Sequence, residues 1–169
     1  MKLTARVSMY VAVTFGASLL LFGQQPPTLE GVWEIARIQS KDGSAENRKP
    51  LPSLVIFTSE HYSMVWMPGS QATRAFEERW LPTDAEKIAR YDEIRVNTGT
   101  YEKEESRLTM TPIVARVPEF VGGTIEWEYQ LTEESLVLNF MDEHSFGGVQ
   151  APIVKANGGV ILTLSRLAP

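Results

Sequence analysis

The chain reads Thr124-Ile125-Glu126-Trp127-Glu128-Tyr129-Gln130-Leu131 over residues 124–131, and this stretch indicates the class of fold. Its residues alternate between two kinds of side chain. The apolar and aromatic positions are Ile125, Trp127, Tyr129 and Leu131, and the polar positions are Thr124, Glu126, Glu128 and Gln130. Because successive side chains of a β-strand point to opposite faces, the stretch predicts an antiparallel strand with one buried and one wet face.

Seven further short runs rich in β-branched and aromatic residues accompany this strand, and turn-type clusters separate most of them. They cover residues 31–38, 54–57, 62–67, 97–103, 107–115, 136–140 and 160–167. Most connections are short, which predicts antiparallel pairing between neighbours in sequence. Pro112 lies inside one run, and a proline in a strand must face an unpaired edge or a bulge, so we expect a break there.

A helix is predicted over residues 84–93, between the third and fourth strands. Thr83 precedes Glu86 by three residues, which is the spacing of a capping box. Ala85, Ile88 and Ala89 then fall on one face at helical spacing. We expect this apolar face to lie on the body of the domain.

The predicted fold is all-β. Eight antiparallel strands joined in sequence order tend to close into an up-and-down barrel, because closure removes the exposed edges. A barrel of eight strands has an interior that either fills with side chains or holds one small ligand.

The first residues are predicted to be an export signal and not part of the barrel. Lys2 and Arg6 precede the uncharged run 7–22, and a polar, proline-rich stretch follows. Gly23 is acceptable at the cleavage site, but Leu21 is larger than the usual residue two positions earlier, so a retained N-terminal anchor is the alternative. The expected domains are a signal over 1–23 and a barrel over 24–169.

Composition limits the class of protein. The 169 residues, 43% of them apolar, are expected to form one globular domain. The absence of cysteine excludes a disulfide scaffold, a thiolate metal site and a cysteine nucleophile. A net charge of −5 without a Lys/Arg run argues against nucleic acid as a partner, and against a membrane partner apart from the signal segment.

Several elements resemble known barrels. Gly31-Val32-Trp33 on the first strand and Arg166 on the last are similar to the lipocalin signature, in which the arginine packs across the tryptophan. The chain more closely resembles the bacterial lipocalin-like domain family, through Gly99-Thr100-Tyr101, the stretch 112–129 and the closing stretch 162–167. The resemblance covers about residues 29–167. It implies a barrel with a pocket but no particular reaction. The predicted signal indicates export to the bacterial periplasm or the extracellular space.

Catalytic and metal-binding patterns are weak. His61 and His144 lie far apart in turn-like segments and form no metal-ligand spacing. Glu126 and Glu128 occupy the polar side of their strand, which argues against a paired-carboxylate site. Ser165 lacks a nucleophile elbow. We therefore predict no catalytic residue, no metal and no cofactor.

The candidate ligand site is aromatic. Strand alternation places Tyr62, Met64, Trp66, Tyr101, Met110, Trp127, Tyr129 and Phe140 inside the barrel. An interior of aromatic residues and Met suits a small apolar or aromatic ligand, although the same residues can simply fill the barrel. Arg37 shares the inward face by parity and is a candidate ligand contact, unless a bulge turns it outward.

Three functions remain open. The leading one is an exported barrel that binds or carries a small hydrophobic or aromatic molecule. The second is an enzyme, of isomerase or hydrolase type, that acts on such a molecule in the same pocket. The third is a filled barrel whose outer face binds another envelope protein. A cavity smaller than ~300 Å³ would count against the first two.

Overall fold

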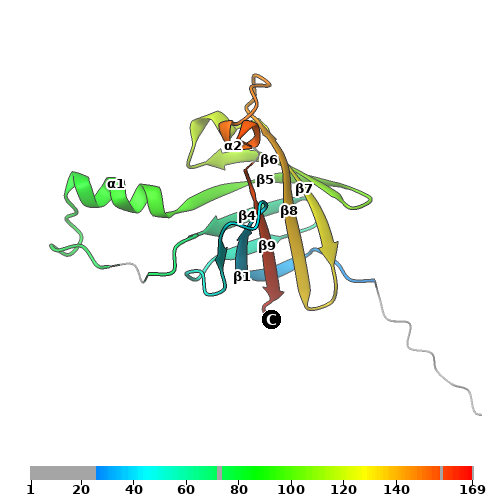
Figure 1. The fold of residues 1–169 in the computed structure, drawn as a ribbon, viewed down its shortest axis with the longest axis horizontal. Coiled ribbons are helices and arrows are strands. Elements are labelled where there is room, and N and C mark those ends of the chain that lie inside the picture. Colours follow the sequence, from blue (N-terminus) through cyan, green and yellow to red (C-terminus); the bar gives the residue numbers. More distant parts are fainter. Residues whose placement is uncertain (1–25, 72–73, 157, 169) are drawn as a thin grey trace, which may run out of the picture.

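The computed structural model describes residues 26–71, 74–156 and 158–168, so the predicted signal over 1–23 lies outside the described residues. The chain forms one antiparallel sheet in the order β2-β1-β3-β4-β5-β6-β7-β8-β9, and β1 also pairs with β9 (Figure 1). This last pairing closes β1 and β3–β9 into a barrel of eight strands. The predicted all-β, eight-stranded antiparallel barrel is confirmed.

The strands follow the sequence order of the prediction, with some longer than expected. They are β1 (Gly31–Ser40), β2 (Glu46–Asn47), β3 (Leu54–Phe57), β4 (His61–Trp66), β5 (Arg95–Glu104), β6 (Arg107–Ala115), β7 (Thr124–Leu131), β8 (Ser135–His144) and β9 (Val160–Arg166). The short β2 was not predicted, and it pairs only with the end of β1.

The break expected at Pro112 is present. The pairing of β5 with β6 shifts register between Thr98 and Gly99, because Ile113 is an extra residue opposite them. Gly99 lies so close to β6 that a Cβ atom built on it would stand 2.0 Å from the carbonyl oxygen of Thr111. Only glycine allows the two backbones to approach this closely.

One end of the barrel is closed by Trp33 and Arg166, which are paired across β1 and β9. Trp33 is fully buried, and its Nε1 donates to the carbonyl oxygen of Leu29 at 2.8 Å. The guanidinium of Arg166 lies over the Trp33 ring, with Cζ 4.0 Å from the centroid, so the predicted stacking is observed. Gly31 leaves room for it, since a Cβ there would lie 2.6 Å from Arg166 Nη1.

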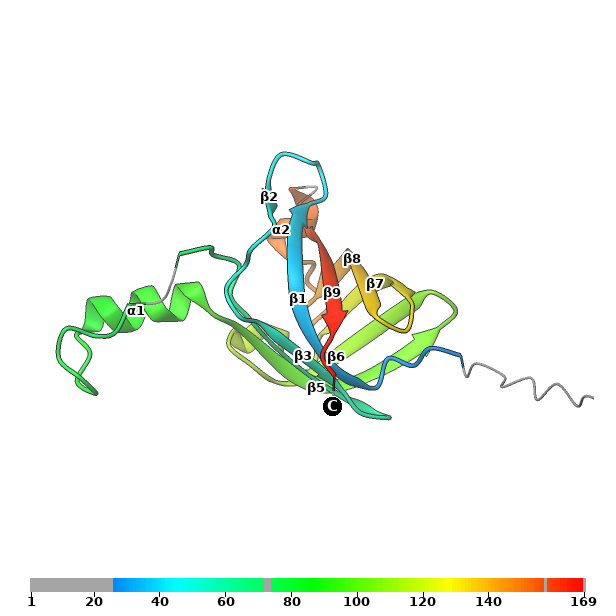
Figure 2. The ribbon, with the colours of Figure 1, turned by 90° about the horizontal axis from the view of Figure 1, so that it is seen from below.

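The helix α1 (Asp84–Glu93) does not lie on the body of the barrel. The capping box of Thr83 and Glu86 is formed. However, no residue of α1 is buried, and Ile88 is 63% exposed. Figures 1 and 2 show α1 extending away from the barrel on an arm that leads into β5. The expectation of a packed helix failed because helical periodicity reveals an apolar face without revealing what covers it.

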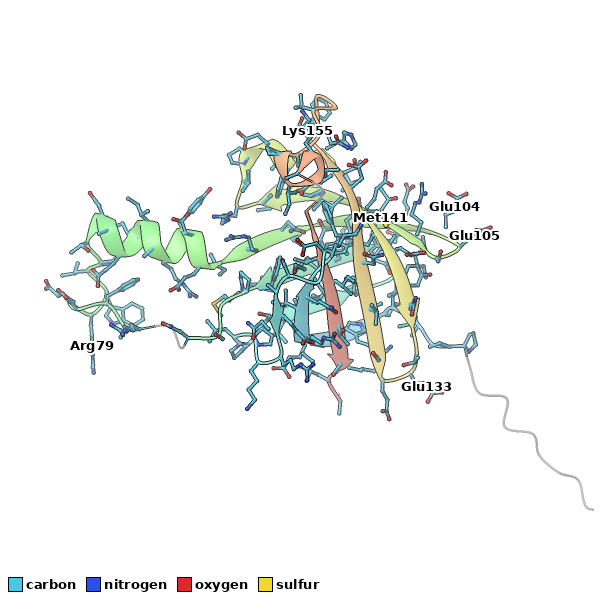
Figure 3. The ribbon with its side chains drawn as sticks, in the orientation of Figure 1. Arg79, Glu104, Glu105, Glu133, Met141 and Lys155 are labelled. Atoms are coloured by element: carbon cyan, nitrogen blue, oxygen red, sulfur yellow. The ribbon has the colours of Figure 1, made fainter. Side chains whose placement is uncertain are left out.

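Two short helical segments lie at the other end of the barrel. These are η1 (Pro118–Phe120), between β6 and β7, and α2 (Pro152–Lys155), between β8 and β9. Figure 3 places Lys155 of α2 at one end of the barrel and Glu133, in the β7–β8 turn, at the opposite end. None of the helices in the described part of the chain is long and apolar enough to span a membrane.

Candidate functional site

A cavity of about 350 Å³ opens at the end of the barrel that carries η1 and α2. Its walls come from β4, β5, β7, β8 and β9 and from the segment that follows β6, and Phe120 of η1 and Ile153 of α2 also line it. The volume exceeds the ~300 Å³ at the lower end of small-molecule sites. The barrel is therefore hollow at this end and closed at the end of Trp33 and Arg166.

Four of the predicted ligand contacts line this cavity. They are Met64 and Trp66 on β4, Trp127 on β7 and Phe140 on β8. Trp127 and Phe140 pack edge to face, with their ring centroids 5.5 Å apart. This geometry fixes both rings and leaves a rigid aromatic wall for an apolar ligand.

The other predicted aromatic and methionine contacts lie outside the cavity lining. Tyr62 and Met110 are buried in the core, and so is Tyr101, whose hydroxyl donates to the carbonyl oxygen of Thr58 at 2.6 Å. Tyr129 is only partly buried and packs against the same core. Strand alternation assigned these side chains to the interior, but it does not tell which interior positions border a void.

Arg37 is not in the cavity. The pairing of β1 with β9 shifts register between Ile35 and Arg37, which turns Ile38 into the core in place of Arg37. The Arg37 side chain pairs with the carboxylate of Glu46 on β2 and donates from Nη2 to Gln39 Oε1 at 2.7 Å. The bulge therefore turns the Arg37 guanidinium out of the barrel interior, and outside it the carboxylate of Glu46 neutralises its charge.

A carboxyl group that the sequence analysis missed faces the cavity. Glu143 on β8 is 7% exposed and lines the cavity. Alternation from Leu138 and Phe140 predicts Asp142 as the next inward residue. Asp142 pairs with Glu126 and Phe140 pairs with Trp127, so Met141 has no partner on β7 and forms a bulge. The bulge shifts the alternation by one residue, and Glu143 points inward instead of Asp142. Figure 3 labels Met141 on β8.

Burial raises the pKa of Glu143 to about 7. Within the described residues, no hydrogen bond or ion pair of its carboxyl group is found. The hydroxyl of Tyr62 is buried without a hydrogen-bond partner, and burial together with the nearby Glu143 raises its pKa. An unpaired carboxyl in an apolar wall favours the protonated form, which can donate a hydrogen bond.

Besides an atom of Arg116, two buried polar atoms of residues that line the cavity have no hydrogen-bond partner among the described residues. They are Oδ1 of Asn97 on β5 and Nε1 of Trp127 on β7. Buried polar groups are normally hydrogen-bonded, and leaving one unsatisfied is costly. An acceptor and a donor in the same cavity lining as Glu143 are therefore available for polar groups of a ligand.

Two arginines stand at the rim of the cavity. Arg95 begins β5 and Arg116 follows β6, and both line the cavity. The backbone N–H of Arg116 donates to the carbonyl oxygen of Val96 at 2.8 Å, which brings the two arginines side by side. Burial and the neighbouring Arg116 lower the pKa of Arg95. Neither residue was singled out from the sequence, because each lies at a strand end where alternation gives no direction.

No family model, curated protein or solved structure matches this chain. The site must therefore be interpreted from its own geometry: an apolar cavity with a buried carboxyl in its wall and two cations at its rim.

The histidines do not contribute to this site. His61 and His144 are absent from the cavity lining, and the ring of His144 lies 3.7 Å from a carboxylate oxygen of Asp142. Across residues 26–71, 74–156 and 158–168, no group of three or more histidine and acidic side chains is placed to hold a metal ion.

Proposed function

We propose that this protein binds or carries a small hydrophobic or aromatic molecule inside its barrel. The observation that carries the proposal is the cavity of about 350 Å³ whose walls include Met64, Trp66, Trp127 and Phe140. Concave sites lined by aromatic and apolar side chains with a few polar groups are typical of small-molecule binding. Burial of a ligand's apolar surface against these rings supplies the affinity.

The proposal includes membership of the bacterial lipocalin-like domain family and export to the periplasm or the extracellular space. The Gly31-Val32-Trp33 start with Arg166 stacked on Trp33 supports the family, and the basic, then apolar start of the sequence supports export. We expect the protein recovered from its native envelope to begin at Gln24. Intact-mass spectrometry checks this, and a mass that includes residues 1–23 would indicate a retained anchor.

A cavity-filling variant tests the binding proposal. Val160 lies at the start of β9 and lines the cavity. Val160→Trp should weaken binding of the neutral fluorescent probe phenylnaphthylamine by about tenfold or more, because the indole occupies the space of the probe. Fluorescence titration measures the affinity.

The matched control is Val65→Trp, since Val65 lies on the outer face of β4 and is 38% exposed. This variant should bind the probe as the wild type does. Equal binding by the wild type and Val160→Trp would place the probe outside the cavity and contradict the proposal.

An enzyme is the second candidate, and Glu143 is the observation that favours it. A general acid or base works best when its pKa lies near the operating pH, and burial brings the pKa of Glu143 to about 7. A single carboxyl of this kind suits proton transfer in an isomerisation. In that case NMR would show wild-type protein converting its co-purified ligand to an isomer, and Glu143→Gln would leave the ligand unchanged.

The third candidate, a protein-interaction module, draws on the arm that carries α1. Trp80, Leu81 and Ile88 are 92%, 64% and 63% exposed on this arm. Large exposed apolar side chains that lie together mark interaction surfaces. Native mass spectrometry of protein from its own envelope separates the candidates: a bound small molecule favours a carrier, and consistently empty protein favours the module.

A further inference from the structure

The rim of the cavity carries positive charge without a matching carboxylate. Arg95 donates from Nη1 to the carbonyl oxygens of Asp92 and Ile94, at 2.5 and 3.3 Å. Arg116 donates from Nη1 to the carbonyl oxygen of Tyr91 at 2.7 Å. In the described part of the chain, neither guanidinium has a carboxylate oxygen within ion-pair distance. Asp92 is the acidic residue whose charge acts on Arg95.

The contacts of the Arg116 guanidinium favour a hydrogen-bond acceptor of the ligand at the cavity rim. Its guanidinium lies over the ring of Tyr91, with Cζ 4.4 Å from the centroid, and this contact fixes the plane of the group. Its Nε is buried and has no hydrogen-bond acceptor among the residues that the structure describes. A buried donor of a charged group without an acceptor is expensive, so a ligand acceptor at this position would be favoured.

Three other residues of the cavity lining favour an uncharged polar group of the ligand over a charged one. Asn97, Trp127 and Glu143 are only 7%, 4% and 7% exposed, and all three line the cavity. Asn97 Oδ1 and Trp127 Nε1 lack partners. These groups are uncharged, or in the case of Glu143 neutral when protonated, so they suit a neutral polar substituent such as a hydroxyl or a carbonyl.

The size of the cavity limits the body of the ligand. About 350 Å³ is near the lower end of the ~300–1,000 Å³ range of small-molecule sites. The aromatic part of the lining is formed by Trp66, Trp127 and Phe140. This space suits one or two fused rings better than a long acyl chain.

We propose that the ligand is a compact aromatic monocarboxylic acid whose carboxylate binds between Arg95 and Arg116 at the rim while its rings lie against Trp127 and Phe140. This inference rests on the proposed function, because it specifies the ligand of the same cavity. A planar carboxylate matches the fork of guanidinium donors, which a neutral group cannot do. The uncharged polar atoms of the lining then select acids that also carry a hydroxyl or carbonyl group.

The Glu143 carboxyl does not oppose this assignment below neutral pH. The rim arginines lie on β5 and just after β6, whereas Glu143 lies on β8. Burial keeps Glu143 protonated in mildly acidic solution, so that the ligand carboxylate meets two cations and a neutral donor.

Two matched compounds test the inference with the full-length protein as it is purified. Naphthoate carries the proposed carboxylate, and naphthylmethanol has the same rings with a neutral hydroxyl. By calorimetry at about pH 6 and low salt, the wild type should bind naphthoate about tenfold or more tightly than naphthylmethanol. Arg95→Met should lower the affinity for naphthoate by about tenfold or more, and its affinity for naphthylmethanol should stay within about threefold of the wild-type value.

The conservative variants separate charge from shape. Arg95→Lys and Arg116→Lys keep the positive charge but lose the planar fork, so each should retain only part of the preference for naphthoate, between the wild type and Arg95→Met. An equal or greater affinity of the wild type for naphthylmethanol would overturn the inference, and so would equal loss of both compounds in Arg95→Met. If the neutral probe phenylnaphthylamine binds while naphthoate does not, the inference fails and the proposed function stands. If none of the three compounds binds, the proposed function fails as well.

Discussion

Trp33→Ala should lower the free energy of unfolding by ~3–5 kcal/mol, the range found when a large aromatic residue is removed from a core. Trp33 is fully buried at the closed end of the barrel, so the substitution leaves a void that the surrounding strands fill only in part. It also removes the partner of the Leu29 carbonyl oxygen and the ring under Arg166. Equilibrium unfolding in urea, monitored by far-UV circular dichroism, measures the change.

Val32→Ala is the matched control, because Val32 is the next residue of β1, faces outward and is 36% exposed. It should cost less than about 1 kcal/mol, in line with a surface substitution. A loss below ~1 kcal/mol for Trp33→Ala would mean that the tryptophan is not needed to close the barrel. Trp33→Phe, which keeps most of the ring, should fall between the two.

The regular strands and the closed end of the barrel were predictable because their signals are local and periodic. Alternation along 124–131 gave one buried face, and Trp127 is indeed buried while Glu128 is exposed. The side chains of Trp33 and Arg166 were placed on inward faces by the same period of two, and strand closure then brings them together. Regular strands with strict register leave little freedom for such residues.

The open end was predictable only in part, because strand irregularities set its chemistry. A bulge removes Arg37 from the interior and another brings in Glu143. Each inserts one residue and inverts the alternation beyond it. Nothing in the local sequence around Met141 marks that insertion. Arg95 and Arg116 lie at strand ends, where their approach depends on how β5 and β6 pair.

The buried carboxyl of Glu143 should make the protein less stable as the pH rises from mildly acidic to neutral. Burial raises its pKa from 4.5 in the unfolded chain to about 7 in the fold. Below about pH 4.5 the group is protonated in both states. Between about 4.5 and 7 the unfolded chain releases the proton while the folded chain retains it, so unfolding becomes easier with rising pH. Above about pH 7 both states are ionised and the difference stays constant.

The pH dependence can be measured as a difference between two proteins. Glu143→Gln keeps the shape of the side chain but cannot ionise. Relative to this variant, the wild type should lose about 3 kcal/mol of unfolding free energy between about pH 4.5 and pH 8. The comparison cancels the titration of the groups that the two proteins share. Urea unfolding at a series of pH values checks it, and a difference that does not change with pH would mean that Glu143 is solvated.

Asp142→Asn is a control on the same strand, because the pKa of Asp142 is shifted in the opposite direction to that of Glu143. The hydrogen bonds from Gln150 and from the backbone N–H of Glu143 lower the pKa of Asp142, so its contribution to stability is lost as the pH falls. Its difference curve should therefore be flat across the range in which that of Glu143 changes. A falling curve for Glu143 beside a flat one for Asp142 would show that the bulge at Met141 has turned one of two adjacent carboxyls into an apolar cavity. A carboxyl in that position is a hydrogen-bond donor when the protein is most stable, and it can then donate to the hydroxyl or carbonyl group of the proposed ligand.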